Sequence, residues 1–201
     1  MDLRDYIRDV PDFPEPGIVF KDITPLLGNA KAFDYAISLL VDKYKDSAFD
    51  GIALVESRGF LFGAPLAREL GKSIVLVRKP GKLPAETYTT DYDLEYGANT
   101  LEIHVDGVEK GQKILIMDDL LATGGTLAAT ARLVEMAGGI VSGIGVIIEL
   151  SFLDGRKNLS EYHVHSLVRY WFRLMNHQTV GVQTELNIGT MVIHEQIGIS
   201  K

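Results

Sequence analysis

The sequence of 201 residues contains no cysteine. A disulfide framework, a thiolate zinc site and a cysteine nucleophile are therefore excluded. The chain also lacks any run of about 18 apolar residues, so we expect no membrane-spanning helix and no membrane partner. The first residues, MDLRDYIRDV, alternate charged and apolar side chains, which is unlike a secretory signal peptide. These absences are compatible with a reducing cytoplasm, and we expect the protein to act there.

Positive charge is also scarce. The chain has 20 lysines and arginines against 27 aspartates and glutamates, which gives a formal net charge of −7. Nucleic-acid binding requires many cations to contact phosphates, so we expect no nucleic-acid partner. A small anion can still bind where a few cations or backbone N–H groups converge.

The remaining composition is that of a globular protein. Apolar residues make up 46% of the chain and charged residues 23%. A chain of this length fits one domain and buries roughly 70% of its unfolded surface. The last part of the sequence is polar and has no clear period. We therefore expect one domain over residues 1–170 and an extension of unassigned role over residues 171–201.

Short β-branched runs alternate with helical periodicity along the chain. Strands are expected at 51–55, 73–77, 113–117, 143–150 and 162–170. Helices are expected at 33–44, 60–70 and 126–137. Most of these strands are continuous apolar runs, which is typical of a parallel sheet covered on both faces. The sequence predicts an α/β fold with an open, mostly parallel sheet flanked by helices, and ligands bind such sheets at the carboxyl ends of the strands.

Residues 79–98 interrupt the alternation. They include two prolines, two glycines and three tyrosines. A stretch of this length without a clear period is typical of a binding loop or lid. We expect a long flexible loop at the active site, with a β-hairpin excursion as the alternative reading of the same residues.

The most informative segment is ILIMDDLLATGGT, residues 114–126, in which an apolar strand ends in Asp118 and Asp119. Gly124 and Gly125 allow the backbone to turn sharply and to approach a ligand closely. The N–H groups of such a turn, with the first turn of the following helix, form an anion site. The two carboxylates can accept hydrogen bonds from ribose hydroxyls or hold Mg²⁺ through water. The segment therefore predicts a sugar-phosphate site.

This segment resembles the phosphoribosyl-diphosphate motif of the type I phosphoribosyltransferases, and its form DDLLATGGT is similar to that of the adenine-specific members. Three further regions agree with the family in sequence and order: DFPEPGIVFKDITPLL (12–27), ESRGFLFGAPLARELG (56–71), and VRKPGKLP with DYDLEYG (77–84 and 91–97). The resemblance covers residues 1–170. It implies a homodimer that, with Mg²⁺, transfers the phosphoribosyl group of 5-phosphoribosyl 1-diphosphate to adenine and releases AMP and diphosphate.

The resemblance also implies a role for each matching residue. The sugar 5′-phosphate is expected at Ala122, Thr123, Gly124, Gly125 and Thr126, and the ribose hydroxyls at Asp118 and Asp119. The diphosphate is expected at Ser57, Arg58, Arg78, Lys79, Lys82 and Tyr96. Adenine is expected at Val19, Phe20, Lys21 and Leu120, with Glu95 as the catalytic residue that assists proton transfer at the base. Mg²⁺ is expected to be held mainly by substrate oxygens and water, without a protein cage.

Three other functions fit the same residues. A transferase of the same fold could act on an oxopurine, although Ala122 stands where many oxopurine enzymes carry aspartate. A non-catalytic regulator could sense the phosphoribosyl ligand, but the net charge of −7 disfavours a nucleic-acid surface. The chain could also be an α/β protein without activity that retains a vestigial site.

Overall fold

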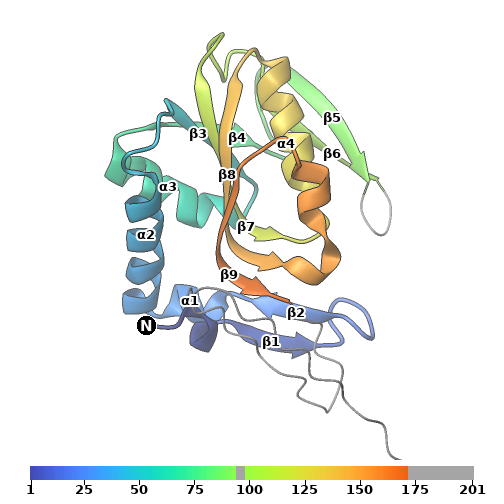
Figure 1. Ribbon diagram of the computed structural model, residues 1–201. Helices are drawn as coiled ribbons and strands as arrows, with labels where there is room; N and C mark the ends of the chain where they lie inside the picture. Colours follow the sequence, from blue (N-terminus) through green and yellow to red (C-terminus); the bar gives the residue numbers. More distant parts are fainter. Residues whose placement is uncertain (94–97, 172–201) are drawn as a thin grey trace, which may run out of the picture.

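The computed structural model describes residues 1–93 and 98–171 (Figure 1). Its centre is a five-stranded parallel sheet with the strand order β4-β3-β7-β8-β9. The strands are β3 (Gly51–Val55), β4 (Ser73–Val77), β7 (Lys113–Leu121), β8 (Ile140–Leu150) and β9 (Val164–Tyr170). The predicted open parallel α/β sheet is confirmed.

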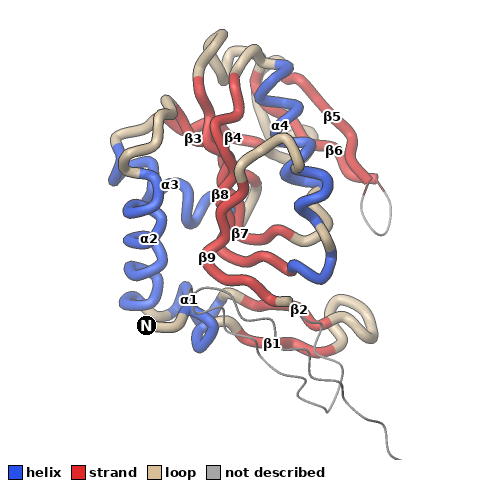
Figure 2. The backbone as a smooth tube through the Cα atoms, in the orientation of Figure 1, coloured by secondary structure: helices blue, strands red, loops and turns tan. Residues whose placement is uncertain are grey.

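Helices cover both faces of this sheet (Figure 2). The three long helices are α2 (Ala30–Tyr44), α3 (Gly59–Leu70) and α4 (Gly125–Met136). The short helical segments are η1 (Leu3–Tyr6), α1 (Thr24–Gly28), η2 (Ser151–Leu153) and η3 (Gly155–Leu159). No helix in the described ranges is long and apolar enough to cross a membrane.

Strand β3 explains why both faces need a helix. Its side chains alternate between the faces of the sheet, as in any strand. Ile52 and Leu54 pack in one core cluster with residues of α2 and α3, whereas Ala53 and Val55 pack in a second cluster with residues of α4. Every residue of β3 is buried, and this double burial accounts for its unbroken apolar sequence.

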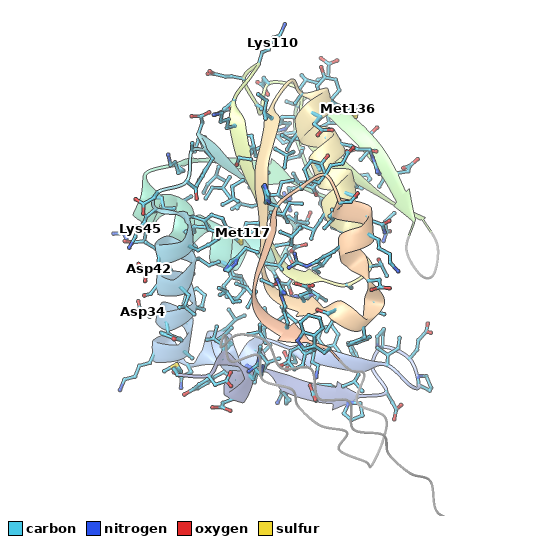
Figure 3. The ribbon with its side chains drawn as sticks, viewed as in Figure 1. Asp34, Asp42, Lys45, Lys110, Met117 and Met136 are labelled. Atoms are coloured by element: carbon cyan, nitrogen blue, oxygen red, sulfur yellow. The ribbon has the colours of Figure 1, made fainter. Side chains whose placement is uncertain are left out.

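Helix α2 has one buried side and one exposed side. Ala36 and Leu40 are fully buried in the core. Asp34 and Asp42 lie on the outer side, where Asp42 pairs with Lys45 at 2.9 Å (Figure 3). This division follows from the 3.6-residue period that predicted the helix.

Two antiparallel hairpins lie outside the parallel sheet. The first joins β1 (Arg8–Pro11) to β2 (Val19–Asp22), and the second joins β5 (Thr87–Asp93) to β6 (Ala98–His104). Much of the segment 79–98, expected as a flexible loop, is therefore paired in a hairpin, as the alternative reading held. The tip of that segment, residues 94–97, lies outside the described residues.

Strand β7 is longer than expected. The apolar run suggested an end at residue 117, but pairing with β8 continues through Asp118 opposite Val146 to Leu121 opposite Glu149. The carboxylates Asp118 and Asp119 thus belong to the strand instead of following it. The ladder hydrogen bonds of a long neighbouring strand keep this polar stretch extended, which periodicity alone does not reveal.

Candidate active site

A cavity of about 400 Å³ lies at the carboxyl ends of β3 and β7 and next to the start of α4. The predicted site residues that line it are Ser57, Arg58, Lys79, Asp118, Asp119, Leu120, Ala122, Thr123, Gly124, Gly125 and Thr126. Groups expected to bind diphosphate, ribose and phosphate, which are distant in sequence, are thus brought to one place. This position agrees with the rule that ligands of parallel α/β sheets bind at the strand ends.

The loop from Ala122 to Thr126 connects β7 to α4, and we call it the phosphate loop. Gly124 has φ of +84°, a left-handed conformation that glycine adopts without strain. Helix α4 begins at the next residue, Gly125. The first N–H groups of a helix have no partner within it, and its dipole favours an anion at this end. The loop and the helix start together suit a phosphate group.

Asp118 and Asp119 are both buried beside this loop, with exposed fractions of 7% and 6%. The backbone N–H of Asp119 donates to Asp118 Oδ1 at 2.8 Å. Burial raises the pKa of Asp118 well above its usual range, and the adjacent charge of Asp119 raises it further. Hydrogen-bond donors or cations that approach this pair would therefore be bound favourably.

Arg58 connects this carboxylate pair to the segment that begins α3. Its Nε donates to Asp119 Oδ2 at 2.5 Å, and its guanidinium carbon lies 5.6 Å from the centroid of the Phe20 ring. The following residue, Gly59, has no room for a side chain, because a Cβ there would lie 2.8 Å from the Met117 carbonyl oxygen. This close approach holds the start of α3, and Arg58 with it, against the middle of β7.

Arg78 follows β4 and pairs with Glu56, a carboxylate to which the sequence motifs assign no role. Its Nε and Nη2 donate to the two carboxylate oxygens of Glu56 at 3.2 and 3.1 Å. Hydrogen bonding from Arg78 lowers the pKa of Glu56. Arg78 Nη1 also donates to the carbonyl oxygen of Lys82 at 3.1 Å. Neither Arg78 nor Lys82 lines the cavity, whereas Glu56 and Lys79 do.

The residues expected at the base lie on β2, apart from Leu120, which lines the cavity. Phe20 packs edge-to-face against Phe13, with ring centroids 5.3 Å apart. Lys21 is buried, and its Nζ lies 2.5 Å from Asp9 Oδ1 and 4.0 Å from the centroid of the Tyr170 ring. Its side chain is thus engaged within the protein.

Two further predicted residues, Glu95 and Tyr96, lie outside the described residues. Within the described ranges, no group of three or more histidine, cysteine, aspartate or glutamate side chains is arranged to hold a metal ion. Any metal at this cavity would therefore need ligands from water or substrate in addition to Asp118 and Asp119.

The parallel sheet, the phosphate loop and the buried carboxylate pair define a phosphoribosyl transferase domain, and the family model of that description matches residues 26–184. Two relatives narrow the class. The adenine phosphoribosyltransferase of Caldanaerobacter subterraneus subsp. tengcongensis is 57% identical over 84% of this chain and 98% of its own length. That of Kosmotoga olearia is 55% identical over 85% of this chain and 100% of its own. The chain belongs to the adenine phosphoribosyltransferase family.

Solved structures agree with this assignment. The adenine phosphoribosyltransferase of Thermoanaerobacter pseudethanolicus superposes with a TM-score of 0.82 at 57% identity, over 84% of this chain and 98% of that one. The enzyme of Saccharomyces cerevisiae, in complex with adenine and an imino-altritol bisphosphate, superposes with a TM-score of 0.77 at 38% identity, over 82% of this chain and 96% of that one.

Proposed function

We propose that this chain transfers the phosphoribosyl group of 5-phosphoribosyl 1-diphosphate to adenine, giving AMP and diphosphate in purine salvage. The observation that carries the proposal is that one cavity is lined by the phosphate loop, the buried pair Asp118 and Asp119, and Arg58. A sugar phosphate with an anionic leaving group requires these three kinds of contact side by side. The family membership of the chain supports adenine as the acceptor.

The donor is expected to bind along the cavity. Its 5′-phosphate takes the backbone N–H groups of the phosphate loop. Its ribose hydroxyls donate to Asp118 and Asp119, which favours the charged form of these buried carboxylates. Its diphosphate takes Ser57, Arg58 and Lys79, and arginine suits a diphosphate because its guanidinium presents several fixed donors.

Adenine is expected next to β2. Backbone groups of Val19 and Lys21 can pair with the edge of the base, and the ring of Phe20 can stack on its face, opposite Leu120. The 5.6 Å contact between Phe20 and Arg58 supports this arrangement, because it joins β2 to the cavity. The Lys21 side chain is engaged with Asp9, so its part in base binding rests on its backbone.

In the reaction, the bond between ribose C1 and the diphosphate oxygen breaks, and adenine N9 forms a bond to C1 from the opposite face. The electron pair leaves with the diphosphate, where Arg58 and Lys79 of this cavity stabilise the growing negative charge. Arg78 and Lys82 do not line this cavity, and we propose that they act on the diphosphate of a neighbouring subunit. Adenine loses the proton of its imidazole ring as N9 bonds to C1, and the Glu95 carboxylate is the group proposed to accept it. Tyr96, the next residue in the sequence, is proposed to contact the diphosphate.

The carboxylate oxygens in the cavity fit Mg²⁺ as a cofactor. Asp118 and Asp119 present hard oxygens that can hold the water molecules around Mg²⁺, and the direct ligands of the ion would be these waters and substrate oxygens. When bound, the ion would supply charge neutralisation at the diphosphate. The buried carboxylates would hold it through water, while the same residues orient the ribose.

We also propose a homodimer in the cytoplasm. Three large apolar side chains on α3 and on the edge strand β4 are 41–45% exposed: Leu61, Ile74 and Leu76. Exposed apolar side chains on one edge of a sheet mark an interaction surface. Directly after β4 come three cations, Arg78, Lys79 and Lys82. In a dimer formed at this edge, the cations of one subunit would lie close to the cavity of the other subunit.

The domain boundary is part of the same proposal. The two relatives align over 98% and 100% of their own lengths but over only 84% and 85% of this chain. Coverage of this size supports a transferase domain of 170 residues, which we place at residues 1–170, whereas the family model runs on to residue 184. For the extension over residues 171–201 we propose no role.

Product formation tests the activity. The chain is incubated with 5-phosphoribosyl 1-diphosphate, Mg²⁺ and one of adenine, hypoxanthine or guanine, and nucleotides are separated by chromatography. We expect AMP from adenine alone and no AMP from the Asp118→Ala/Asp119→Ala variant. IMP or GMP in place of AMP would replace the proposed acceptor by an oxopurine. Absence of any nucleotide from a folded chain that binds the donor would favour a regulator.

A further inference from the structure

The phosphate loop packs against a segment that follows it by about thirty residues, the short helix η3 (Gly155–Leu159). A Cβ built on Gly155 would lie 2.1 Å from the carbonyl oxygen of Ala122. A Cβ built on Gly124 would lie 2.4 Å from the carbonyl oxygen of Gly155. The two backbones therefore touch directly, and a side chain at either glycine would force them apart.

A side-chain hydrogen bond adds to this contact. Asn158 Nδ2 donates to the carbonyl oxygen of Thr123 at 2.8 Å. The carbonyl groups of both Ala122 and Thr123 thus face η3. We call Gly155 and Asn158 the carbonyl bracket.

Because the peptide bond is planar, the direction of these carbonyl groups also fixes the direction of the N–H groups that follow them. In a trans peptide unit, the carbonyl group and the N–H of the next residue point in opposite directions. Carbonyls that face η3 therefore turn the N–H groups of Thr123 and Gly124 to the other side of the loop. The cavity is on that side, because the phosphate loop lines it and η3 does not.

The bracket is itself fixed to the sheet. Arg156 donates from Nε and Nη2 to the two carboxylate oxygens of Glu149 on β8, at 2.8 and 2.7 Å. Arg156 Nη1 also donates to the carbonyl oxygen of Val164 at 3.1 Å, and the Ser166 hydroxyl donates to Glu149. Burial alone would raise the pKa of Glu149, but the hydrogen bonds from Arg156 and Ser166 outweigh it and lower this pKa to about 2. Glu149 is charged at neutral pH, and η3 cannot shift without breaking this pair.

We propose that Asn158 and Gly155 are positioning residues for the sugar 5′-phosphate, which hold the carbonyls of the phosphate loop so that its N–H groups face the cavity. This rests on the proposed function, in which that loop binds the phosphate. Neither residue lines the cavity, so each acts through the backbone of Ala122, Thr123 and Gly124. The phosphate-binding conformation is thus set by groups behind the loop.

The test uses Asn158→Ala, with Lys157→Ala as the matched control. Lys157 is the neighbouring residue, its side chain is 77% exposed, and it pairs with Asp154 at the surface. For wild type and both variants, the measurements are the dissociation constants of ribose 5-phosphate, ribose, AMP and adenosine, together with kcat and the KM values of both substrates. The melting temperature of each variant checks its folding.

Loss of one neutral hydrogen bond weakens an interaction by roughly twofold to tenfold. We expect Asn158→Ala to weaken the binding of ribose 5-phosphate and of AMP by such a factor. The KM for 5-phosphoribosyl 1-diphosphate should rise by the same factor. Adenosine affinity and the KM for adenine should not change, and Lys157→Ala should match wild type throughout. Asn158→Asp should bind ribose 5-phosphate and AMP more weakly still than Asn158→Ala does, because a carboxylate cannot donate to the Thr123 carbonyl and repels the nearby phosphate. Gly155→Ala should show the same ligand selectivity.

Equal losses of affinity for AMP and for adenosine in Asn158→Ala would overturn the proposal, because a general structural defect weakens both ligands whether or not they carry a phosphate. Unchanged ribose 5-phosphate affinity in a folded Asn158→Ala chain would overturn it as well. The binding measurements are independent of turnover. If wild type binds ribose 5-phosphate in the expected way but forms no AMP, the proposed function fails while the bracket stands. If wild type binds ribose 5-phosphate no more tightly than ribose, both proposals fail.

Discussion

Arg58 and Asp119 are joined by a hydrogen bond of 2.5 Å from Nε to Oδ2, although they lie on different elements and are 61 residues apart in sequence. The pair links the segment proposed for the diphosphate to the carboxylates proposed for the ribose. The Arg58 side chain is 45% exposed, whereas that of Asp119 is 9% exposed. Arg58 is therefore an accessible cation at the point where the proposed sites for the leaving group and the sugar meet.

Replacement of Arg58 by glutamine should lower kcat/KM for 5-phosphoribosyl 1-diphosphate. A hydrogen bond to a charged group contributes about 1.5–3 kcal/mol, which corresponds to a loss of roughly tenfold to 150-fold. Steady-state kinetics measure this loss. Arg68→Gln on the exposed side of α3, where the side chain is 82% exposed, provides the control and should behave like wild type. If kcat/KM for 5-phosphoribosyl 1-diphosphate were the same in both variants, Arg58 would not be part of the diphosphate site.

Replacement of Asp118 by asparagine should separate stability from activity. The raised pKa of Asp118 means that its ionised form is disfavoured in the folded state. Its unfavourable contribution is absent below the unfolded-state pKa and grows as the pH rises through the folded-state pKa. Asp118→Asn should therefore melt at a higher temperature than wild type at neutral pH, with a difference that shrinks on acidification, while AMP formation falls. A lower melting temperature at neutral pH would contradict this.

Glu149 should have the opposite dependence on pH. Its folded-state pKa of about 2 lies below the reference value of 4.5, so its stabilisation is complete above pH 4.5 and is lost as the pH falls toward 2. Glu149→Gln should lower the free energy of unfolding at pH 7 by about 2 kcal/mol, after allowance for the partial exposure of Arg156. Urea unfolding of both chains between pH 7 and pH 3 measures the difference. A gap independent of pH would mean that the charge of Glu149 is not responsible.

Replacement of Lys21 by methionine should act mainly on stability. The change removes the ion pair with Asp9 and the cation over the Tyr170 ring, together worth about 1–2 kcal/mol. Thermal unfolding and the KM for adenine are the measurements, with Lys45→Met as a control, since Lys45 pairs with Asp42 at the surface. We expect a lower melting temperature for Lys21→Met and an adenine KM within about twofold of wild type. A large rise in this KM without destabilisation would assign the Lys21 side chain to the base.

The edge strand β4 should be needed for the homodimer. Ile74→Glu places a charge among the exposed apolar side chains of this edge, where desolvation in an interface would be costly. Light scattering after size exclusion should give a dimer for wild type and a monomer for Ile74→Glu. Met136→Glu is the control, because Met136 is 49% exposed and lies on α4, which packs with Val75 and Val77 on the face of β4 opposite Ile74. A dimeric Ile74→Glu chain would rule out this edge as the interface.

The parts of the fold predicted from sequence are those with a strong local pattern. Strands β3 and β4 have the predicted ends, because each is an apolar run bounded by polar residues or glycine. Helices α2, α3 and α4 lie where their periodicity placed them. The hairpin of β1 and β2 went unpredicted, since each strand has only four residues and neither alternates clearly between buried and exposed positions.

The site divides in the same way. The strand-end motifs at Arg58 and Asp118 could be assigned to one cavity, because parallel strands end at a common edge. The pairing of Arg78 with Glu56 and the support from Asn158 could not be predicted. Both depend on contacts between distant segments, and GRKN at residues 155–158 reads locally as an exposed polar turn. Sequence patterns report on a residue's own element and not on what that element is packed against.

The contact between Gly124 and Gly155 has a consequence for synthesis of the chain. All the residues proposed to touch the donor and the base have left the ribosome once Thr126 has emerged. The backbone that supports the phosphate loop follows only after β8 has been made, about thirty residues later. A nascent chain halted between these points would carry every proposed binding residue but would lack Gly155 and Asn158, which contact the phosphate loop.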